Sequence, residues 1–243
     1  MEEGNYIEQS AINKADLLLY PTIWAADSAI TDYGADESKL KIVPFGANMD
    51  QIPSKEMVNT KKKSDKCRLL FLGVDWERKG GEIAFETLIE LGKMNVNAEL
   101  TVCGCIPPGE FKHENMRVIP FLDKNEPEQN KELQQLFLKS DFLLLPSRTE
   151  AYGVVFCEAN AYGLPAITTD TGGIPGVIEE GKNGFMFPLK ARGREYAELI
   201  SEVHGDDQKY YQLVRTSREI FETKLNWDVW GIQVCSHIKK FIR

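Results

Sequence analysis

The chain has 243 residues, of which 42% are hydrophobic and 27% are charged, and its formal net charge is -8 at pH 7. This length and apolar content can bury one large core, which excludes a disordered chain and favours a globular α/β enzyme domain. The excess of acidic residues argues against a surface that grips nucleic-acid phosphates, because such binding depends on clustered Lys and Arg. We therefore expect no nucleic-acid partner.

Five cysteines form an odd set without C-x-x-C spacing: Cys67, Cys103, Cys105, Cys157 and Cys235. That usage fits a reducing compartment better than a disulfide framework. The pair Cys103 and Cys105 could bind a metal, but no His or Cys cluster completes a ligand set, so packing at a strand end is favoured. The sequence has no apolar run long enough to span a bilayer and no signal-peptide core at its N-terminus. These features predict a cytoplasmic protein, at most peripheral to the inner face of a membrane.

Roughly the first sixty residues predict short elements that do not complete a domain. Residues 8–15 are typical of the end of a helix, and the apolar run 16–21, closed by proline, predicts a short buried strand. A helix is expected from about residue 22 to residue 33, followed by a second short strand within 40–46. The charged run 61–66 is interpreted as a solvated linker.

From residue 67 onward, apolar strands alternate with helical periods, which is the pattern of a parallel sheet wrapped by helices. The expected strands are residues 67–72, 99–103, 117–119, 142–145 and 166–169. The expected helices are residues 81–94, 128–140, 154–162 and 193–203, with two more at the C-terminus. The predicted fold class is therefore α/β, a doubly wound Rossmann-like parallel sheet.

The loop at residues 73–81 directly follows the first of these strands. Ligands of open α/β sheets bind beyond the carboxyl ends of the strands. Here Gly73 lets the backbone approach a ligand, Arg78 and Lys79 supply positive charge, and the start of the next helix favours an anion. A diphosphate suits this loop, although a surface turn with a basic pair explains it equally well. The loop has neither the G-x-G-x-x-G nor the P-loop fingerprint.

The loop at residues 146–153 leaves a very apolar strand and leads into a helix. Glu150 lies in the loop and Glu158 about one turn into the helix, so both carboxylates can face the same cleft. Free amides near Gly153 would point at a phosphate, and the carboxylates would accept hydrogen bonds from sugar hydroxyls. Taken singly, each glutamate is more often a solvated residue or one favoured by the helix dipole.

The loop at residues 169–176 follows the last expected strand. Its three glycines and one proline indicate a tightly bent backbone, and Gly172 and Gly173 can pass close to a bound group. A plain loop explains this motif by itself. Three such loops at one edge of a sheet nevertheless favour a binding site.

The two glutamates, Glu150 and Glu158, match an E-x7-E signature. The sequence EANAYGLPA continues from the second glutamate, and the glycine pair of the loop 169–176, Gly181 and Gly184 follow in order. In these features the chain resembles the C-terminal nucleotide-binding domain of the GT-B retaining glycosyltransferases, especially glycosyltransferase family 4. The resemblance covers nearly the whole chain.

The resemblance implies a role for each motif. Glu158 would hold the ribose diol, Glu150 would lie beside the donor sugar, and Lys79 would pair with the diphosphate, which makes Glu150 and Lys79 the expected catalytic residues. Amides of residues 152–155 would face the sugar and the diphosphate. The expected substrate-binding residues are Gly73, Arg78, Lys79, Phe121, Leu122, Glu150, Ala151, Tyr152, Gly153, Val154, Val155, Glu158, Gly172 and Gly173.

One position departs from the family pattern. An arginine commonly follows the first-strand glycine in this family, but Val74 stands there in this chain. Arg78 either substitutes for that arginine or faces solvent. The base would lie against the segment 120–122.

The resemblance also divides the chain. Residues 1–50 resemble the tail of an N-terminal acceptor domain, residues 51–66 a linker, and residues 67–243 the nucleotide-sugar-binding domain with C-terminal junction helices. We therefore expect most of the acceptor-binding half to be missing from this chain, and an association with such an N-terminal domain.

The implied function is transfer of a hexose from a UDP-, GDP- or ADP-sugar to an unidentified glycan, lipid or small-molecule acceptor, with retention of configuration and without a metal or other cofactor. In that chemistry the protein positions the donor and stabilises the departing diphosphate. Glu150 would orient the sugar, because no second carboxylate is placed to act with it as in a glycosidase. Two other classes stay open. One is an NAD-dependent oxidoreductase, disfavoured by the missing glycine fingerprint, and the other is a fragment that binds a nucleotide sugar or a partner chain without turnover.

Overall fold

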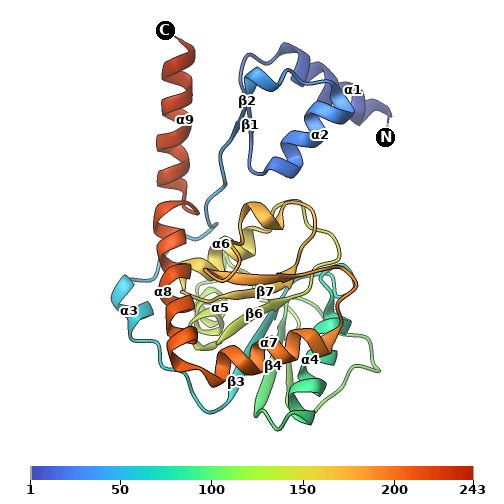
Figure 1. Ribbon diagram of the computed structural model, residues 1–243, viewed down its shortest axis with the longest axis vertical. Coiled ribbons are helices and arrows are strands. Elements are labelled where there is room, and N and C mark those ends of the chain that lie inside the picture. The colour runs from blue at the N-terminus through green and yellow to red at the C-terminus, as the bar shows by residue number, and fades with distance from the viewer. Residues whose placement is uncertain (1, 243) are drawn as a thin grey trace.

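The computed structural model describes residues 2–242 and places a six-stranded parallel sheet at the centre of the main domain (Figure 1). The strand order is β5-β4-β3-β6-β7-β8. Its strands are β3 (Cys67–Leu72), β4 (Ala98–Cys103), β5 (Met116–Ile119), β6 (Phe142–Leu145), β7 (Ala166–Thr169) and β8 (Gly184–Phe187). The chain winds outward from β3 in one direction and from β6 in the other, so the predicted doubly wound α/β fold is confirmed and its switch point lies between these two strands.

Most of the five expected strands form because each is a short apolar run that the sheet buries, whereas the edge strand β5 is largely exposed. All four residues of β6 are fully buried, as are the core positions of β3. The edge strand β8 was not predicted, because its sequence GFMF begins at a glycine and is only half-buried. Gly184 packs so closely on β7 that a Cβ would lie 2.2 Å from the Ala166 carbonyl oxygen. A side chain at this position would therefore separate the two strands.

Helices cover both faces of the sheet (Figure 1). Helix α4 packs on α7, and α6 packs on α8. The helices of the main domain are α4 (Gly81–Lys93), α5 (Pro127–Lys139), α6 (Val154–Ala161), α7 (Gly193–Gly205) and α8 (Asp207–Thr223). The four predicted by residue range all lie within a few residues of these bounds, and α8 is the first of the two expected at the C-terminus.

The N-terminal segment forms a small unit of its own, drawn in blue in Figure 1. Strands β1 (Leu18–Tyr20) and β2 (Leu40–Ile42) pair in parallel, and helices α1 (Glu2–Lys14) and α2 (Ile23–Tyr33) pack beside them. The two predicted strands and two predicted helices are all present. The unit meets the main domain at Thr22, whose side chain lies against the turn formed by residues 173–176.

The charged run at residues 61–66 differs from the predicted solvated linker. A short helix, α3 (Lys55–Asn59), precedes it, and Lys61 and Lys63 are partly buried. The Lys63 amide donates to the Tyr211 hydroxyl at 3.1 Å, and its ammonium donates to the His204 carbonyl. The stems of Lys61 and Lys63 pack along the domain, and Lys63 has hydrogen-bond partners there, whereas the buried Lys61 ammonium has none among the described residues, so much of this run is bound to the main domain.

The segment that leaves β2 is fastened to the start of the last helix, α9 (Trp227–Phe241). The Tyr152 hydroxyl donates to the Phe45 carbonyl at 2.7 Å, and the Phe45 ring stacks on Trp227 with centroids 5.8 Å apart. Gly46 allows this contact, because a Cβ there would lie 2.4 Å from the Trp227 nitrogen.

Gly46→Ala is therefore expected to lower the free energy of unfolding by about 2 kcal/mol, because the methyl group meets backbone that cannot move freely. Urea denaturation followed by tryptophan fluorescence measures this. The matched control is Gly92→Ala within α4, where a Cβ meets nothing within 4 Å and helix propensity should give a small gain in stability. Equal effects of the two substitutions would contradict the close junction.

Candidate functional site

A cavity of about 420 Å³ opens at the carboxyl edge of the sheet, at the switch point between β3 and β6. Its walls come from the loops after β3, β4, β5 and β6 and from the first residues of α6. Ten of the predicted site residues line it: Gly73, Arg78, Lys79, Phe121, Leu122, Glu150, Gly153, Val154, Val155 and Glu158. Motifs that are widely separated in sequence thus meet at one cavity.

The remaining predicted site residues lie outside this cavity. Tyr152 is buried and binds the Phe45 carbonyl, and Ala151 precedes it in the loop. Gly172 and Gly173 approach the backbone of the loop that carries Glu150, where the sequence suggested a bound group. The close approach expected of these glycines is present, but protein backbone occupies the other side of the contact.

Lys79 and Glu150 form the centre of one wall. The Lys79 side chain packs over Gly73, and its ammonium donates to the Glu150 carboxylate. Arg78 lies farther out, 4.0 Å from Glu150, and also pairs with Asp75 at 3.4 Å. Both side chains of the Lys79–Glu150 pair are about nine-tenths buried. Lys79, the cation predicted to bind a diphosphate, is therefore held inside the cavity by Glu150, the carboxylate predicted to lie beside the donor sugar.

The backbone of Glu150 is fixed by the turn at residues 172–173. The Gly173 amide donates to the Glu150 carbonyl at 3.0 Å. Gly172 has φ of +54°, and a Cβ there would lie 2.0 Å from the same carbonyl oxygen. This left-handed conformation and this close approach both require glycine.

The start of α6 presents its positive end to the cavity. Gly153 caps the helix in a left-handed conformation with φ of +84° and offers no side chain to the first amides. Val154 and Val155, the first two helical residues, line the cavity. Amides at these positions have no partner within the helix, so this helix end favours an anion.

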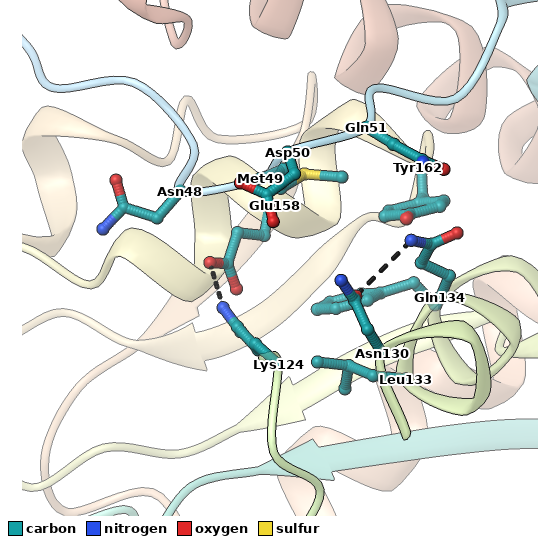
Figure 2. Close-up of a pocket in the computed structure, with 11 residues that line it drawn as sticks. Asn48, Met49, Asp50, Gln51, Lys124, Asn130, Leu133, Gln134, Glu158 and Tyr162 are labelled. Carbon is teal, nitrogen blue, oxygen red and sulfur yellow. Dashed lines mark hydrogen bonds and ion pairs between the residues drawn. The ribbon is translucent and has the colours of Figure 1, made fainter. Parts of the chain in front are cut away.

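Glu158 is paired with a lysine that the sequence analysis did not single out. Its carboxylate is buried, with 4% of the residue exposed, and Oε1 accepts a hydrogen bond from the Lys124 ammonium at 2.6 Å (Figure 2). Burial raises the pKa of Glu158, and the Lys124 ammonium opposes that rise. Lys124 follows β5, so the rule that ligands bind beyond strand ends could have found it.

A smaller pocket of about 40 Å³ adjoins the cavity and is shown in Figure 2. The two share Asn48, Lys124, Leu133 and Glu158. This volume holds only a few water molecules. Asn48 reaches the site from the segment after β2, and its side chain accepts from the Trp227 indole at 3.2 Å. Sequence reasoning could not place Asn48 here, because only tertiary folding brings that segment across.

Within residues 2–242, no group of three or more His, Cys, Asp and Glu side chains lies close enough to hold a metal ion. No helix in that part of the chain is long and apolar enough to cross a membrane.

A family model described as "Glycosyl transferases group 1" matches residues 54–220, more than half of the chain. The chain therefore belongs to this glycosyltransferase family, as the resemblance had predicted. The family assignment and the missing glycine fingerprint together leave no support for the dehydrogenase alternative.

Curated relatives carry related names. A D-inositol 3-phosphate glycosyltransferase of Paenarthrobacter aurescens is 23% identical over 218 residues, which cover 85% of this chain and 52% of the relative. One from Corynebacterium jeikeium is 26% identical over 205 residues, covering 76% of this chain and 48% of the relative. The chain thus spans about half the length of these relatives.

Solved structures share the fold. Anabaena Alr3699/HepE in complex with UDP and glucose aligns with a TM-score of 0.71 at 18% identity, covering 94% of this chain and 64% of that one. WaaG, a glycosyltransferase involved in lipopolysaccharide biosynthesis, aligns with a TM-score of 0.70 at 22% identity, covering 89% and 61%. These similarities confirm the Rossmann-like sheet of a GT-B glycosyltransferase.

The buried carboxylate of Glu158 is expected to lower the stability of the folded protein where it is ionised. Because its pKa is raised in the folded state, ionising it disfavours folding as the pH rises through that pKa. Glu158→Gln is expected to raise the free energy of unfolding at about pH 8 by up to roughly 1 kcal/mol. The gain should shrink as the pH falls, since a protonated glutamate resembles glutamine.

Urea unfolding between about pH 5 and about pH 8 measures this dependence. Glu219→Gln, at an exposed position in α8, is the matched control and should show no such trend. A loss of stability in Glu158→Gln across the whole range would mean that the pair with Lys124 outweighs the cost of burial.

Proposed function

We propose that this chain is the donor-binding part of a retaining hexosyltransferase of the family 4 type. The observation that carries the proposal is the convergence of Lys79, Glu150, Glu158 and the start of α6, which has no side-chain cap, on one cavity at the switch point. A cation and a helix end suit a diphosphate, and two carboxylates suit sugar hydroxyls. The donor is a UDP-, GDP- or ADP-sugar.

Each group has a part in the proposed transfer. Lys79 and the first amides of α6 bind the diphosphate and stabilise the charge that it gains as its bond to the anomeric carbon breaks. Glu158 accepts hydrogen bonds from the ribose, and Glu150 orients the donor sugar and pairs with Lys79. An acceptor hydroxyl forms the new bond on the same face of the sugar, and its proton leaves with the diphosphate.

The division of the chain is part of the proposal. Residues 1–50 correspond to the tail of an acceptor domain, residues 51–66 to a linker and residues 67–243 to the donor domain. The small β1-β2 unit and the fastening of the following segment to α9 support this division. The acceptor, a glycan, lipid or small molecule, would bind mainly to an N-terminal domain associated with this one. We also propose a cytoplasmic location, which the five free cysteines support.

A second candidate function is binding of a nucleotide sugar or a partner chain without turnover. The chain covers about half the length of its relatives, which favours this reading for the chain by itself. Donor hydrolysis and transfer, measured for this chain beside a form extended by an acceptor domain, distinguish the two. Turnover by the present chain would remove the second candidate.

We expect a nucleoside diphosphate to bind in the micromolar to millimolar range, and Lys79→Met to weaken it about tenfold or more, because the ammonium and the helix end hold the phosphates together. Calorimetry with UDP, GDP and ADP measures this and identifies the base. Lys112→Met, at an exposed loop position, is the matched control. Unchanged affinity in Lys79→Met would remove this lysine from the site.

The same titrations in EDTA test whether binding of the diphosphate requires a metal ion. We propose that binding needs no metal or other cofactor, since the groups assigned to the phosphates are a lysine and backbone amides. Affinity should survive the chelator. Loss with EDTA and recovery with manganese would contradict this part of the proposal.

The two glutamates should differ in which ligands they affect. Glu158→Ala should weaken a nucleoside diphosphate and its nucleotide sugar alike, by about 1.5–3 kcal/mol, because a charged acceptor is lost. Glu150→Ala should preserve or improve affinity for the plain diphosphate, since it frees the Lys79 ammonium, and should weaken only the nucleotide sugar. Identical behaviour of both variants toward both ligands would contradict the assignment of these two roles.

A further inference from the structure

The ion pair between Glu158 and Lys124 lies on the border between the main cavity and the small pocket beside it (Figure 2). The two ends of the pair differ in exposure. The Glu158 side chain is 5% exposed and the Lys124 side chain 48% exposed. A buried carboxylate without a partner is strongly disfavoured, so loss of the ion pair would cost more free energy at the buried glutamate than at the half-exposed lysine.

Only one carboxylate oxygen is used by the pair. Lys124 donates to Oε1, and no other hydrogen bond to this carboxylate occurs among the residues that the structure describes. An ionised carboxylate can accept several hydrogen bonds, so Oε2 retains its full capacity. The carboxylate faces a cavity large enough for a nucleotide part, whereas the adjoining pocket is too small.

The loop that carries Lys124 is ordered by its own contacts. The Asp123 amide donates to the Gln129 side chain at 2.8 Å, and the Asn125 amide donates to the Asp123 carboxylate at 2.9 Å. These bonds fix the backbone on both sides of Lys124 independently of Glu158. The lysine is therefore presented to the carboxylate by a preformed loop, and its loss should leave the loop in place.

We propose that Lys124 is a positioning residue for ribose recognition, which holds the Glu158 carboxylate by Oε1 and leaves Oε2 to accept from a ribose hydroxyl. This inference rests on the proposed function of the cavity. A plug is the competing arrangement, in which Lys124 blocks Glu158 and must leave before a nucleotide enters. The two arrangements predict opposite effects of removing the lysine.

The charges around Glu158 make its ionisation depend on Lys124. Cys157 and Tyr162 lie on the same helix, Asp50 lines the small pocket on the segment after β2, and the Lys79–Glu150 pair lies on the other side of the cavity. Lys124 is the cation in contact with the carboxylate. Burial raises the pKa of Glu158 and Lys124 lowers it, so removing the lysine should raise that pKa further.

The test compares Lys124→Met with Lys124→Arg and with Lys131→Met, an exposed control on α5. Carboxyl-carbon NMR of the ligand-free protein follows the titration of Glu158, identified by its absence in Glu158→Gln. The Glu158 pKa should rise in Lys124→Met and stay near its wild-type value in the other two. Calorimetry with UDP, GDP and ADP should show about tenfold weaker binding in Lys124→Met, most of it restored in Lys124→Arg.

Each other outcome has a definite meaning. Tighter binding in Lys124→Met would overturn the proposal in favour of a plug. Unchanged binding and an unchanged Glu158 pKa, with Glu158→Gln still impaired, would overturn the positioning role and leave the proposed function intact. If the wild-type protein binds none of the three diphosphates, the proposed function fails, and with it the role of Lys124 toward ribose.

Discussion

The close approach of the loops after β3 and β6 is the constraint on which the site depends. These strands are neighbours at the switch point, and the chain continues from each of them toward a different face of the sheet. A crevice therefore opens beside the two loops. Backbone contacts set its width: the Arg148 amide donates to the Arg78 carbonyl at 2.8 Å, and a Cβ on Gly80 would lie 2.0 Å from the Pro146 carbonyl oxygen. Because these contacts involve main chain, the positions of Lys79 and Glu150 are fixed by the fold before any ligand is present.

Charge pairing inside the crevice follows from burial. Two carboxylates, Glu150 and Glu158, line the cavity on largely buried side chains, and each is matched by one lysine from a different loop. An unpaired buried carboxylate would be costly, which accounts for the pairing of both acids with lysines. A ligand that brings both negative phosphates and neutral hydroxyls can exchange for these contacts without leaving a buried charge unmatched, whereas an uncharged sugar could satisfy only the acids. The pairing therefore favours a nucleotide-linked sugar over a free one.

The sequence predicted the fold best where burial is complete. Strands β3, β6 and β7 were found at their observed bounds because short runs dominated by buried residues have one stable place in such a sheet. The edge strand β8 and the five-residue helix α3 were missed because neither has a full apolar period. In the site, residues adjacent to strands were identified, but Lys124 and Asn48 were not. Asn48 reaches the site only through tertiary folding and its contact with Trp227, which no local pattern records. The place of Lys124 after β5 could have drawn attention to it, but its contact with Glu158 is tertiary.

At the glycine pair 172–173, the predicted close approach is present, but the group that approaches is protein backbone and not a ligand. Two glycines after a strand do indicate that something approaches the backbone closely, and the structure contains that approach. The group that approaches is the Glu150 carbonyl, so the turn supports the loop that carries Glu150. The same logic applies at Gly104, where a Cβ would lie 2.8 Å from the Gly73 carbonyl oxygen. Closely packed glycines thus hold together the loops whose side chains line the cavity, and a rigid backbone lets a few charged groups act with defined geometry.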